Sequence, residues 1–347
     1  MSGAGDAGPL LQVRGLTTVI RSGGRELPAV SEVSFTVAAG RTLGLVGESG
    51  CGKSLTALSI LRLLPEPAAR IAGGAIYFDG VDLAAAPEAI LRDIRGRSIA
   101  MIFQEPSTAL NPVLTIADQV GEPLRIHQGL SRKQADARAV ALLEKVGIPA
   151  AAERARAYPH QLSGGMKQRA TIAMALSCAP RLLIADEPTT ALDVTVQAQI
   201  LQLLGRLGRE LGMAQLLITH DLGVVAETCD DVAVMYAGRI VEHATASALF
   251  AAPRHPYTVG LLRAVPRAES TNPAHAAPGS ATRARLLEIA GTVPPLSAPP
   301  PGCAFADRCP RADAACRAAL PKLAPTADDP AHLVRCIHPH APGEKVV

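Results

Sequence analysis

Residues 47–54 read Gly-Glu-Ser-Gly-Cys-Gly-Lys-Ser, a spacing that fixes both a local backbone shape and a chemistry. The run lies between an apolar stretch at 42–46 and a stretch with helical spacing after Lys53. In this strand–loop–helix context, glycines let backbone N–H groups turn inward around phosphate oxygens. The lysine reaches the outer phosphates, and the serine hydroxyl can bind Mg²⁺. The sequence therefore predicts a nucleotide phosphate site formed by Gly47, Glu48, Ser49, Gly50, Cys51, Gly52, Lys53 and Ser54.

Short apolar runs alternate along the chain with longer stretches of helical spacing. The runs are bounded by Gly, Asp or polar residues, which is typical of strands, several of them buried on both faces. They lie at 33–37, 42–47, 75–80, 98–104, 182–186, 215–220 and 232–238. Helical spacing is clearest at 54–64 and 196–211. This alternation predicts an α/β architecture with a mainly parallel sheet.

Helical patterns alone occupy the stretch from about 105 to 161. Within it, Ser131 and Gln134 have the spacing of a capping box, and the helical pattern stops at Gly147. We predict a helical insertion here. Beyond about 250, residues 253–266 predict one short helix, residues 269–284 a flexible segment, and a proline-rich stretch leads to a cysteine region. There is no internal repeat, so we expect one nucleotide-binding unit in this chain.

A second strand-like run, residues 182–186, ends in two acidic residues, Asp186 and Glu187. A carboxylate at the end of a buried strand is poorly solvated unless it serves a cation, so we expect Asp186 to hold Mg²⁺ directly or through water. Glu187 then lies beside the terminal phosphate, where a carboxylate can orient and polarise water. Without the phosphate loop, two solvated turn residues would be the better interpretation.

Charge and composition narrow the function classes. The chain has 34 Lys and Arg against 31 Asp and Glu, a net charge of +3, and no basic block, so we expect no nucleic-acid partner. The first residues lack the order of a secretory signal, and no run reaches the roughly 18 apolar residues of a membrane span. We expect a cytosolic chain. Its seven cysteines, four of them beyond residue 300, then favour metal over disulfides.

The order of the motifs resembles the ATP-binding cassette (ABC) family over residues 10 to about 250. Between the phosphate loop and the acidic strand lie Phe-Gln-Glu-Pro at 103–106 and Leu-Ser-Gly-Gly at 162–165; Ala-Leu-Asp at 191–193 and a Thr-His-Asp at 219–221 follow. Leu-Ser-Gly-Gly is the most specific piece, because other P-loop ATPases lack it. The resemblance implies that two cassettes pack head to tail and that this segment closes over ATP held by the partner. The residues implied to bind ATP in trans are Leu162, Ser163, Gly164, Gly165 and Asp193.

The resemblance also implies roles for individual residues near the phosphates. Glu187, His220 and Gln104 are the implied catalytic residues: Glu187 activates water, Gln104 senses Mg²⁺ and water, and His220 contacts the γ-phosphate. Ser54, Gln104 and Asp186 are the implied Mg²⁺ ligands.

Two positions depart from the family pattern. The family usually stacks adenine on an aromatic residue, whereas this chain offers only Val19 or Ile20, so we expect apolar contact, with Ile20 as the candidate. Cys51 replaces the more usual serine, and we expect its modification to block ATP binding.

The implied fold is a P-loop ABC cassette in the α/β class. It has a mainly parallel core sheet, an antiparallel β subdomain, a helical insertion and a small cysteine-rich C-terminal extension. The expected divisions are a nucleotide-binding domain at 1–250, with its helical subdomain at about 105–180, and an extension at 251–347.

Residues 103–112, 255–262 and 291–310 together resemble the ATPase subunits of bacterial dipeptide, oligopeptide and nickel importers. The resemblance implies peptide uptake driven by ATP hydrolysis, with nickel or another small solute as the alternative. It implies a second ATPase chain, commonly a related but different one, two membrane permease subunits and an extracytoplasmic binding protein. The chain would then lie peripherally on the cytoplasmic side of the membrane. The alternatives from other classes are a soluble ABC ATPase of repair or translation, and an iron–sulfur binding or sensing module.

Cys303, Cys309, Cys316 and Cys336 are spaced more widely than the tight pairs of most structural zinc sites. Four thiolates can hold an iron–sulfur cluster, and some members of the resembled branch carry a four-iron, four-sulfur cluster at these cysteines. A 4Fe-4S cluster is therefore the leading expectation. Zn²⁺ and free thiols remain the alternatives.

Overall fold

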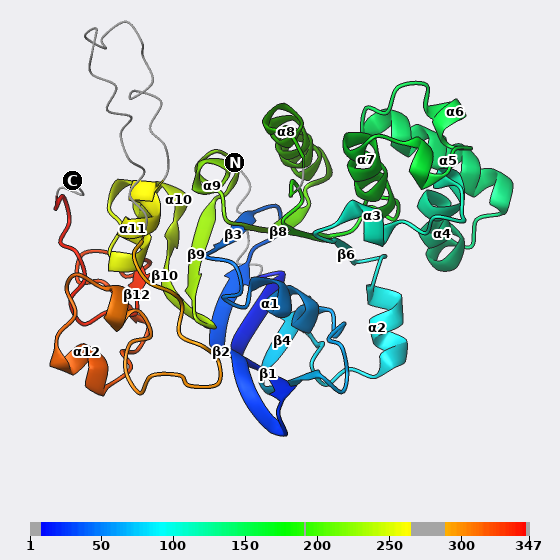
Figure 1. Cartoon of the computed structure of the whole chain (residues 1–347). Coiled ribbons are helices and arrows are strands. Elements are labelled where there is room, and N and C mark those ends of the chain that lie inside the picture. The colour runs from blue at the N-terminus through cyan, green and yellow to red at the C-terminus, as the bar shows by residue number, and fades with distance from the viewer. Residues whose placement is uncertain (1–7, 191, 265–288, 345–347) are drawn as a thin grey trace, which may run out of the picture.

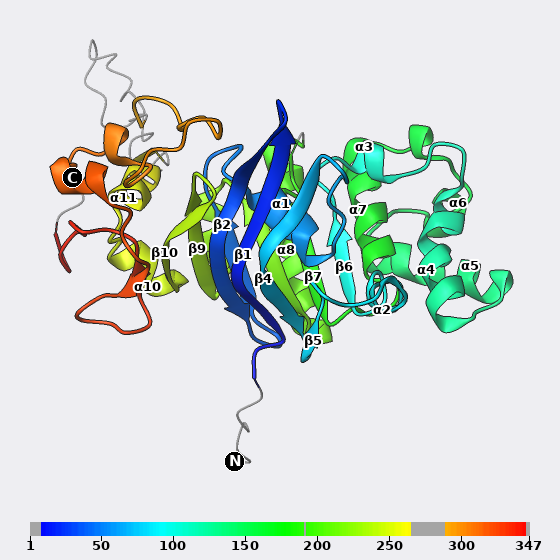
Figure 2. The same ribbon diagram turned by 90° about the horizontal axis from the view of Figure 1, so that it is seen from below.

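The computed structural model describes residues 8–190, 192–264 and 289–344. It has three parts, which Figure 1 shows side by side: helices of the insertion at one end, two sheets in the centre, and the C-terminal elements at the other end. Figure 2, from a perpendicular direction, shows the same order. The segment at 269–284 that the sequence predicts to be flexible lies outside the described residues.

An antiparallel sheet confirms the expected β subdomain. Its order is β2-β1-β4-β5, built from β1 (Leu11–Ser22), β2 (Arg25–Val37), β4 (Ala69–Phe78) and β5 (Val81–Asp82). The sheet packs on α1 (Lys53–Ile60), the helix that follows the phosphate loop, and the buried hydroxyls of Thr18 and Ser59 meet at 2.8 Å. The sheet and the core strands bury a shared apolar cluster that includes Leu16, Phe35 and Ile76.

The larger sheet has the order β11-β12-β10-β9-β3-β8-β7-β6. Its strands are β3 (Thr42–Val46), β6 (Ile99–Ile102), β7 (Leu182–Asp186), β8 (Ala214–Thr219), β9 (Asp231–Tyr236), β10 (Arg239–Thr245), β11 (Ala324–Pro325) and β12 (Leu333–Val334). The five strands from β9 to β6 pair in parallel, as the alternation predicts, and β10, β12 and β11 add an antiparallel edge. Parallel strands place their carboxyl ends at one edge, where ligands bind in such sheets.

The helical insertion is confirmed as a run of helices without strands in the described part of 106–175. It comprises α3 (Pro106–Ala109), α4 (Ile116–Gln128), α5 (Arg132–Lys145), α6 (Ala151–Arg154), the 3₁₀ helix η1 (Pro159–Gln161) and α7 (Gly164–Ala175). The predicted capping box forms: Ser131 accepts from the Gln134 backbone N–H, and Gln134 accepts from that of Ser131. The helix ends just before Gly147, whose φ of 80° continues the chain in the left-handed region.

The other helices cover the sheets or belong to the C-terminal part. They are α2 (Glu88–Ile94), α8 (Val194–Leu211), α9 (Leu222–Thr228), α10 (Ala246–Ala251), α11 (Pro256–Ala264), the 3₁₀ helix η4 (Ala306–Arg308) and α12 (Ala314–Ala318). The predicted short helix at 253–266 corresponds to α11. None of the helices in the described residues is long and apolar enough to cross a membrane.

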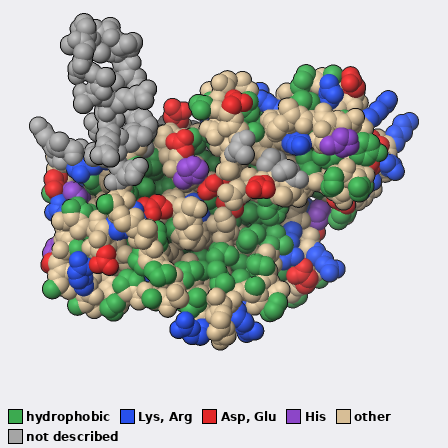
Figure 3. Space-filling view, viewed as in Figure 1, with side chains coloured by type: hydrophobic (Ala, Val, Ile, Leu, Met, Phe, Trp, Pro, Cys, Tyr) green, Lys and Arg blue, Asp and Glu red, His purple; other side chains and the backbone are tan. Residues whose placement is uncertain are grey.

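Residues beyond 250 do not stand apart from the core. Strand β12 pairs with β10, so residues from the C-terminal part extend the large sheet. An apolar cluster also joins Val234 and Tyr236 of β9 to Tyr257 of α11 and to Phe305. On the face in Figure 3, hydrophobic side chains gather over the centre, whereas charged side chains of both signs lie mainly around them.

Candidate active site

The predicted phosphate loop joins the carboxyl end of β3 to the first turn of α1. Gly52 precedes the helix with a φ of 105°, a backbone shape that L side chains rarely adopt. A side chain at Gly47 would place its Cβ 2.1 Å from the carbonyl oxygen of Met235 on β9. The loop therefore needs glycine at both positions, one for its turn and one for its approach to the neighbouring strand.

Lys53 lies inside the loop. Its side chain is buried, and Nζ donates to the carbonyl oxygens of Gly47 at 2.7 Å and Glu48 at 3.0 Å. The same Nζ is 4.0 Å from Oε1 of Glu187, which follows the acidic end of β7. The cation is thus held where the loop and the acidic strand meet.

Ser54, in the first turn of α1, contacts Asp186 at the carboxyl end of β7. The Ser54 hydroxyl donates to Oδ1 of Asp186 at 3.1 Å. Burial is the main cause that raises the pKa of Asp186, the neighbouring Glu187 raises it further, and the Ser54 hydroxyl and Lys53 oppose the shift. A buried carboxylate beside a hydroxyl offers the hard oxygen ligands that Mg²⁺ prefers.

Glu187 begins the loop after β7 with a φ of 45°, in the left-handed region that side-chain-bearing residues adopt only rarely. Its Oε2 accepts from Gln104 Nε2 at 3.2 Å and from the Thr190 hydroxyl at 3.0 Å, and lies 3.6 Å from Nδ1 of His220. Gln104 follows β6 and His220 follows β8. The structure thus brings the three predicted catalytic residues together.

The predicted trans residues form a second, separate group. Ser163 is the N-cap of α7 and accepts from the Met166 backbone N–H at 3.4 Å, while Asp193 caps α8 and accepts from Val196 at 2.9 Å. The two helix starts adjoin, because a Cβ at Gly165 would lie 3.1 Å from Val196. Leu162 is buried, whereas Ser163, Gly164 and Asp193 are exposed. No hydrogen bond or ion pair among the described residues joins Ser163 to residues 47–54.

Two further predicted ligands lie apart from the catalytic side chains. Ile20 is half-buried near the end of β1, opposite Leu27 and Ala69. Cys51 is 1% exposed, and burial raises the pKa of its thiol. Modification of Cys51 is expected to block ATP binding. Its burial means that a reagent reaches the thiol only when the loop opens.

Three residues that contact this site were not singled out from the sequence. Gln168 on α7 donates to the carbonyl oxygen of Pro188 at 2.6 Å, linking the helix after Ser163 to the Glu187 loop. The Tyr257 hydroxyl accepts from the Glu48 backbone N–H at 2.9 Å, and Arg308 forms an ion pair with the Glu48 carboxylate. For Tyr257 the available signal was the His-Pro-Tyr run at 255–257; no local signal points to Arg308.

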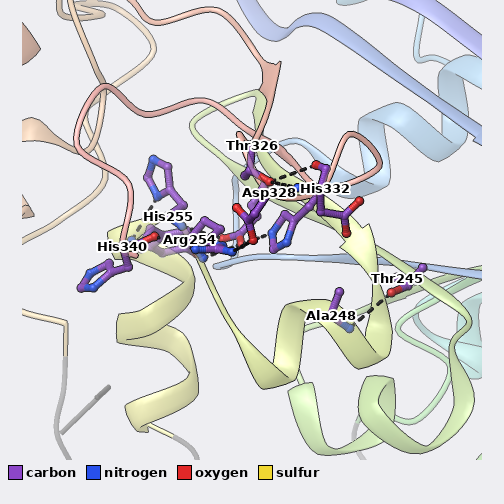
Figure 4. Close-up of polar contacts among 11 residues, drawn as sticks. Thr245, Ala248, Arg254, His255, Thr326, Asp328, His332 and His340 are labelled. Atoms are coloured by element: carbon purple, nitrogen blue, oxygen red, sulfur yellow. Dashed lines mark hydrogen bonds and ion pairs between the residues drawn. The ribbon is translucent and has the colours of Figure 1, made fainter. Parts of the chain in front are cut away.

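A buried polar network holds the His-Pro-Tyr run in place (Figure 4). The Glu242 carboxylate on β10 is fully buried and accepts from the backbone N–H groups of Arg254 and His255, at 2.7 and 2.8 Å. It also lies 2.7 Å from Nε2 of His332. His255 Nδ1 in turn accepts from the Tyr257 backbone N–H at 3.0 Å. The network thereby fixes the start of α11 and the position of Tyr257.

The four C-terminal cysteines line one cavity, together with Phe305, Pro256 and His338. Backbone N–H groups of Arg311 and His338 donate to the sulfurs of Cys309 and Cys336 at 3.4 and 3.3 Å. Among the described residues, three ligand atoms lie within 4.8 Å of one another only for Asp313, Cys316 and His338. The free space between the walls, about 10 Å³, is that of one water molecule.

Comparison with known proteins identifies the cassette. Residues 30–190 match the family model described as ABC transporter, and residues 241–316 match that of the oligopeptide/dipeptide transporter C-terminal region. A protein of Brucella melitensis, provisionally named a peptide import ATP-binding protein, is 55% identical over 95% of this chain and 97% of its own length. The chain belongs to the ABC transporter family. It is one of the family's ATPases.

Other proteins similar to this ABC ATPase are also ATP-binding components or cassettes of transporters. The dipeptide transport ATP-binding protein DppD of Bacillus subtilis is 48% identical over 94% of both chains. Among solved structures, the dimeric cassette MJ0796 in a post-hydrolysis state with ADP and Pi has a TM-score of 0.61 at 28% identity, covering 68% of this chain and 98% of its own. CbiO1 from Clostridium perfringens, part of the transporter complex cbiONQ, has a TM-score of 0.59 at 27% identity, covering 71% and 92%.

Proposed function

We propose that this ABC ATPase hydrolyses ATP to drive the uptake of peptides through a bacterial importer. The observation that carries the proposal is the match of residues 241–316 to the oligopeptide/dipeptide transporter C-terminal region, together with relatives named for peptide import along nearly the whole chain. A nickel or other small-solute importer is the alternative within the same branch. Neither a soluble ABC ATPase nor an iron–sulfur sensor accounts for the match beyond residue 240.

The geometry of the site supports the chemistry that we propose for it. Lys53 binds the outer phosphates, and Ser54 with Asp186, joined by Gln104, would hold Mg²⁺, which neutralises charge on the transferring phosphoryl group. Glu187 orients the attacking water and accepts its proton. Its carboxylate is kept in place by Gln104 and Thr190, and His220 lies 3.6 Å from it after β8. From there His220 would contact the γ-phosphate. The remaining loop residues surround the phosphates with backbone N–H groups, and Ile20 contacts adenine.

The active site is completed by a second cassette. Ser163, Gly164 and Gly165 form an exposed helix start away from residues 47–54 of their own chain, as expected of a segment that binds a partner's ATP. Leu162 and Asp193 support the same surface. The dimeric assembly of the MJ0796 cassette favours this arrangement. We propose that the partner is a related but different ATPase chain.

The transport partners are two permease subunits and an extracytoplasmic binding protein, with this chain bound peripherally on the cytoplasmic side. Exposed large apolar side chains support a permease contact: Phe103 precedes Gln104, and Val113, Leu114 and Ile126 lie in the helical insertion, each at least 38% exposed. Exposed apolar surface is used in contacts with other proteins. For the division of the chain, we keep a nucleotide-binding domain at 1–250, with its helical subdomain at about 105–180, and an extension at 251–347.

The test is to purify this chain with its permeases and partner ATPase in a lipid bilayer and to measure ATP turnover. Peptide-loaded binding protein should stimulate turnover several-fold, whereas nickel-loaded or empty binding protein should not. Stimulation by nickel alone would favour the alternative solute. If no loaded binding protein changed the rate of ATP turnover, the result would contradict the proposal that this chain belongs to an importer.

We also propose that the four C-terminal cysteines hold a 4Fe-4S cluster. A single tetrahedral zinc, with Zn–S of about 2.3 Å, separates its sulfurs by about 3.8 Å. In this chain no three of the four thiols lie within 4.8 Å of one another, among the described residues, so a zinc ion would require the thiols to move together. Backbone donors to Cys309 and Cys336 suit cluster thiolates. Because the free space is small, the thiols must move outward to admit the cluster.

Anaerobic purification with metal analysis decides between these ligands. A cluster gives about four irons and four sulfides per chain and a visible absorption band. One zinc per chain, or no metal with four titratable thiols, would contradict it. Cys178, which lies outside this cavity, supplies the control: Cys178→Ser should keep the iron, and Cys309→Ser should lose it.

A further inference from the structure

The backbone N–H and the carboxylate of Glu48, the second residue of the phosphate loop, both bond to side chains from the C-terminal part. Its backbone N–H donates to the Tyr257 hydroxyl at 2.9 Å. Both carboxylate oxygens accept from Arg308, Nη1 to Oε2 at 2.9 Å and Nη2 to Oε1 at 3.0 Å. Arg308 lies 260 positions further along the chain and immediately precedes Cys309. The loop and the cysteine segment are therefore in direct contact.

Arg308 uses all five of its N–H donors. Besides the two bonds to Glu48, Nη1 donates to the Tyr236 hydroxyl at 3.2 Å, Nη2 to the Ile289 carbonyl at 3.0 Å and Nε to the Ala290 carbonyl at 3.0 Å. The side chain is 6% exposed and its guanidinium lies near the rings of Tyr236 and Phe305. A guanidinium fixed by five bonds and two rings sets the carboxylate it binds in one place.

The charge of Glu48 matters because of its position. The residue lies within the loop that surrounds the phosphates, and its carbonyl oxygen already receives Lys53 Nζ. An uncompensated carboxylate there would repel the phosphates of ATP, and the partly buried site would screen this repulsion only weakly. A bidentate arginine removes the repulsion and keeps the side chain turned toward the C-terminal part.

We propose that Arg308 is a positioning residue of the ATP site: it neutralises Glu48 and fixes the phosphate loop for nucleotide binding. The inference rests on the proposed ATPase function and deepens it, because it makes the segment beyond residue 300 part of the nucleotide site. A purely structural Arg308 would hold the C-terminal part in place without changing affinity for ATP.

The experiment measures binding of a fluorescent ATP analogue with Mg²⁺ to the purified full chain, well below the melting temperature of every variant. Arg308→Ala should raise Kd by about tenfold, because it leaves Glu48 unpaired. The double variant R308A/E48Q should bind several-fold more tightly than Arg308→Ala alone, because it no longer carries an unpaired carboxylate in the loop.

Matched controls separate affinity from stability. Arg317→Ala breaks an exposed ion pair with Asp307 in the same segment and should leave Kd unchanged. If Arg308→Ala does not fold, Arg308→Met keeps the side-chain length and carries the same expectation. Parental affinity in Arg308→Ala, or a double variant R308A/E48Q that binds no better than Arg308→Ala, would overturn the inference. A parent chain that binds no nucleotide would instead overturn the proposed function.

Discussion

The amide of Gln104 donates to the carboxylate of Glu187 across 3.2 Å, although the two residues are 83 positions apart. Each follows the carboxyl end of a parallel strand, β6 or β7, and these strands are neighbours in the sheet. Thr190 holds the same carboxylate oxygen from the other side, and His220 lies 3.6 Å away. Glu187 therefore has a fixed position from which to orient water.

The first prediction concerns the replacement of this carboxylate by an amide. Glu187→Gln should lower ATP turnover of the assembled transporter by about 100-fold or more, because the water loses its base. Nucleotide affinity should stay within about threefold of the parent, since Lys53 and the loop are unchanged. Turnover and binding of Mg-ATP provide the two measurements. Glu227→Gln, on the exposed side of α9, is the control and should change neither. Parental turnover in Glu187→Gln would show that another group activates water.

Ser163 and Ser131 provide a matched pair for the shared active site. Both are N-cap serines that accept from the third backbone N–H of their helices, so each alanine variant should lose about 1 kcal/mol of stability. Only Ser163→Ala should lower turnover in the assembled complex, by about tenfold, because it removes a donor to the transferring phosphate. ATP binding by the isolated chain should be the same in both variants. Weaker binding by isolated Ser163→Ala would mean that the serine acts on its own chain's nucleotide.

Cys51 should be nearly inert in the folded protein. Its thiol is buried, and burial raises its pKa, so little reactive thiolate is present. Iodoacetamide should modify Cys51 at least about tenfold more slowly than Cys178, which is half-buried, as measured by peptide mass spectrometry. In denaturant the two rates should become similar. Equal rates in the native chain would mean that the phosphate loop opens readily.

His243 on β10 should make stability fall in mild acid. Its Nε2 is buried without a hydrogen-bond partner among the described residues, and burial is the main cause that lowers its pKa, opposed by Asp231 and assisted by His332. The folded pKa of His243 lies below the unfolded value of about 6.5. Its contribution to the free energy of unfolding is therefore complete above that pH and is lost as pH falls, by at most about 1.4 kcal/mol per pH unit.

Urea unfolding at pH 7 and pH 5 measures this effect. His243→Gln should reduce the acid-induced loss in the free energy of unfolding relative to the parent. His160→Gln, at an exposed histidine, should leave that loss unchanged. The assignment would be wrong if both variants lost the same stability as the parent between the two pH values.

Local patterns identified most of the core. Buried apolar runs predicted β3, β7, β8 and β9, and the capping box at Ser131 located the start of α5, because these signals come from residues close in the sequence. Strands β1 and β10 were not predicted. β1 mixes polar and apolar residues with a glycine at Gly15, and β10 contains Glu242 and His243, whose burial depends on partners elsewhere.

The sequence by itself determined the phosphate loop, the acidic strand end and the family, because each is a short run whose spacing specifies its chemistry. Only the tertiary structure decided which distant residues meet: Gln104 with Glu187, and Arg308 with Glu48 across 260 positions. Contacts of this kind depend on how the strands order themselves in the sheet and on how the C-terminal segment packs against it. Local propensity carries no information about either, since both are set by burial of surfaces that lie far apart in the chain.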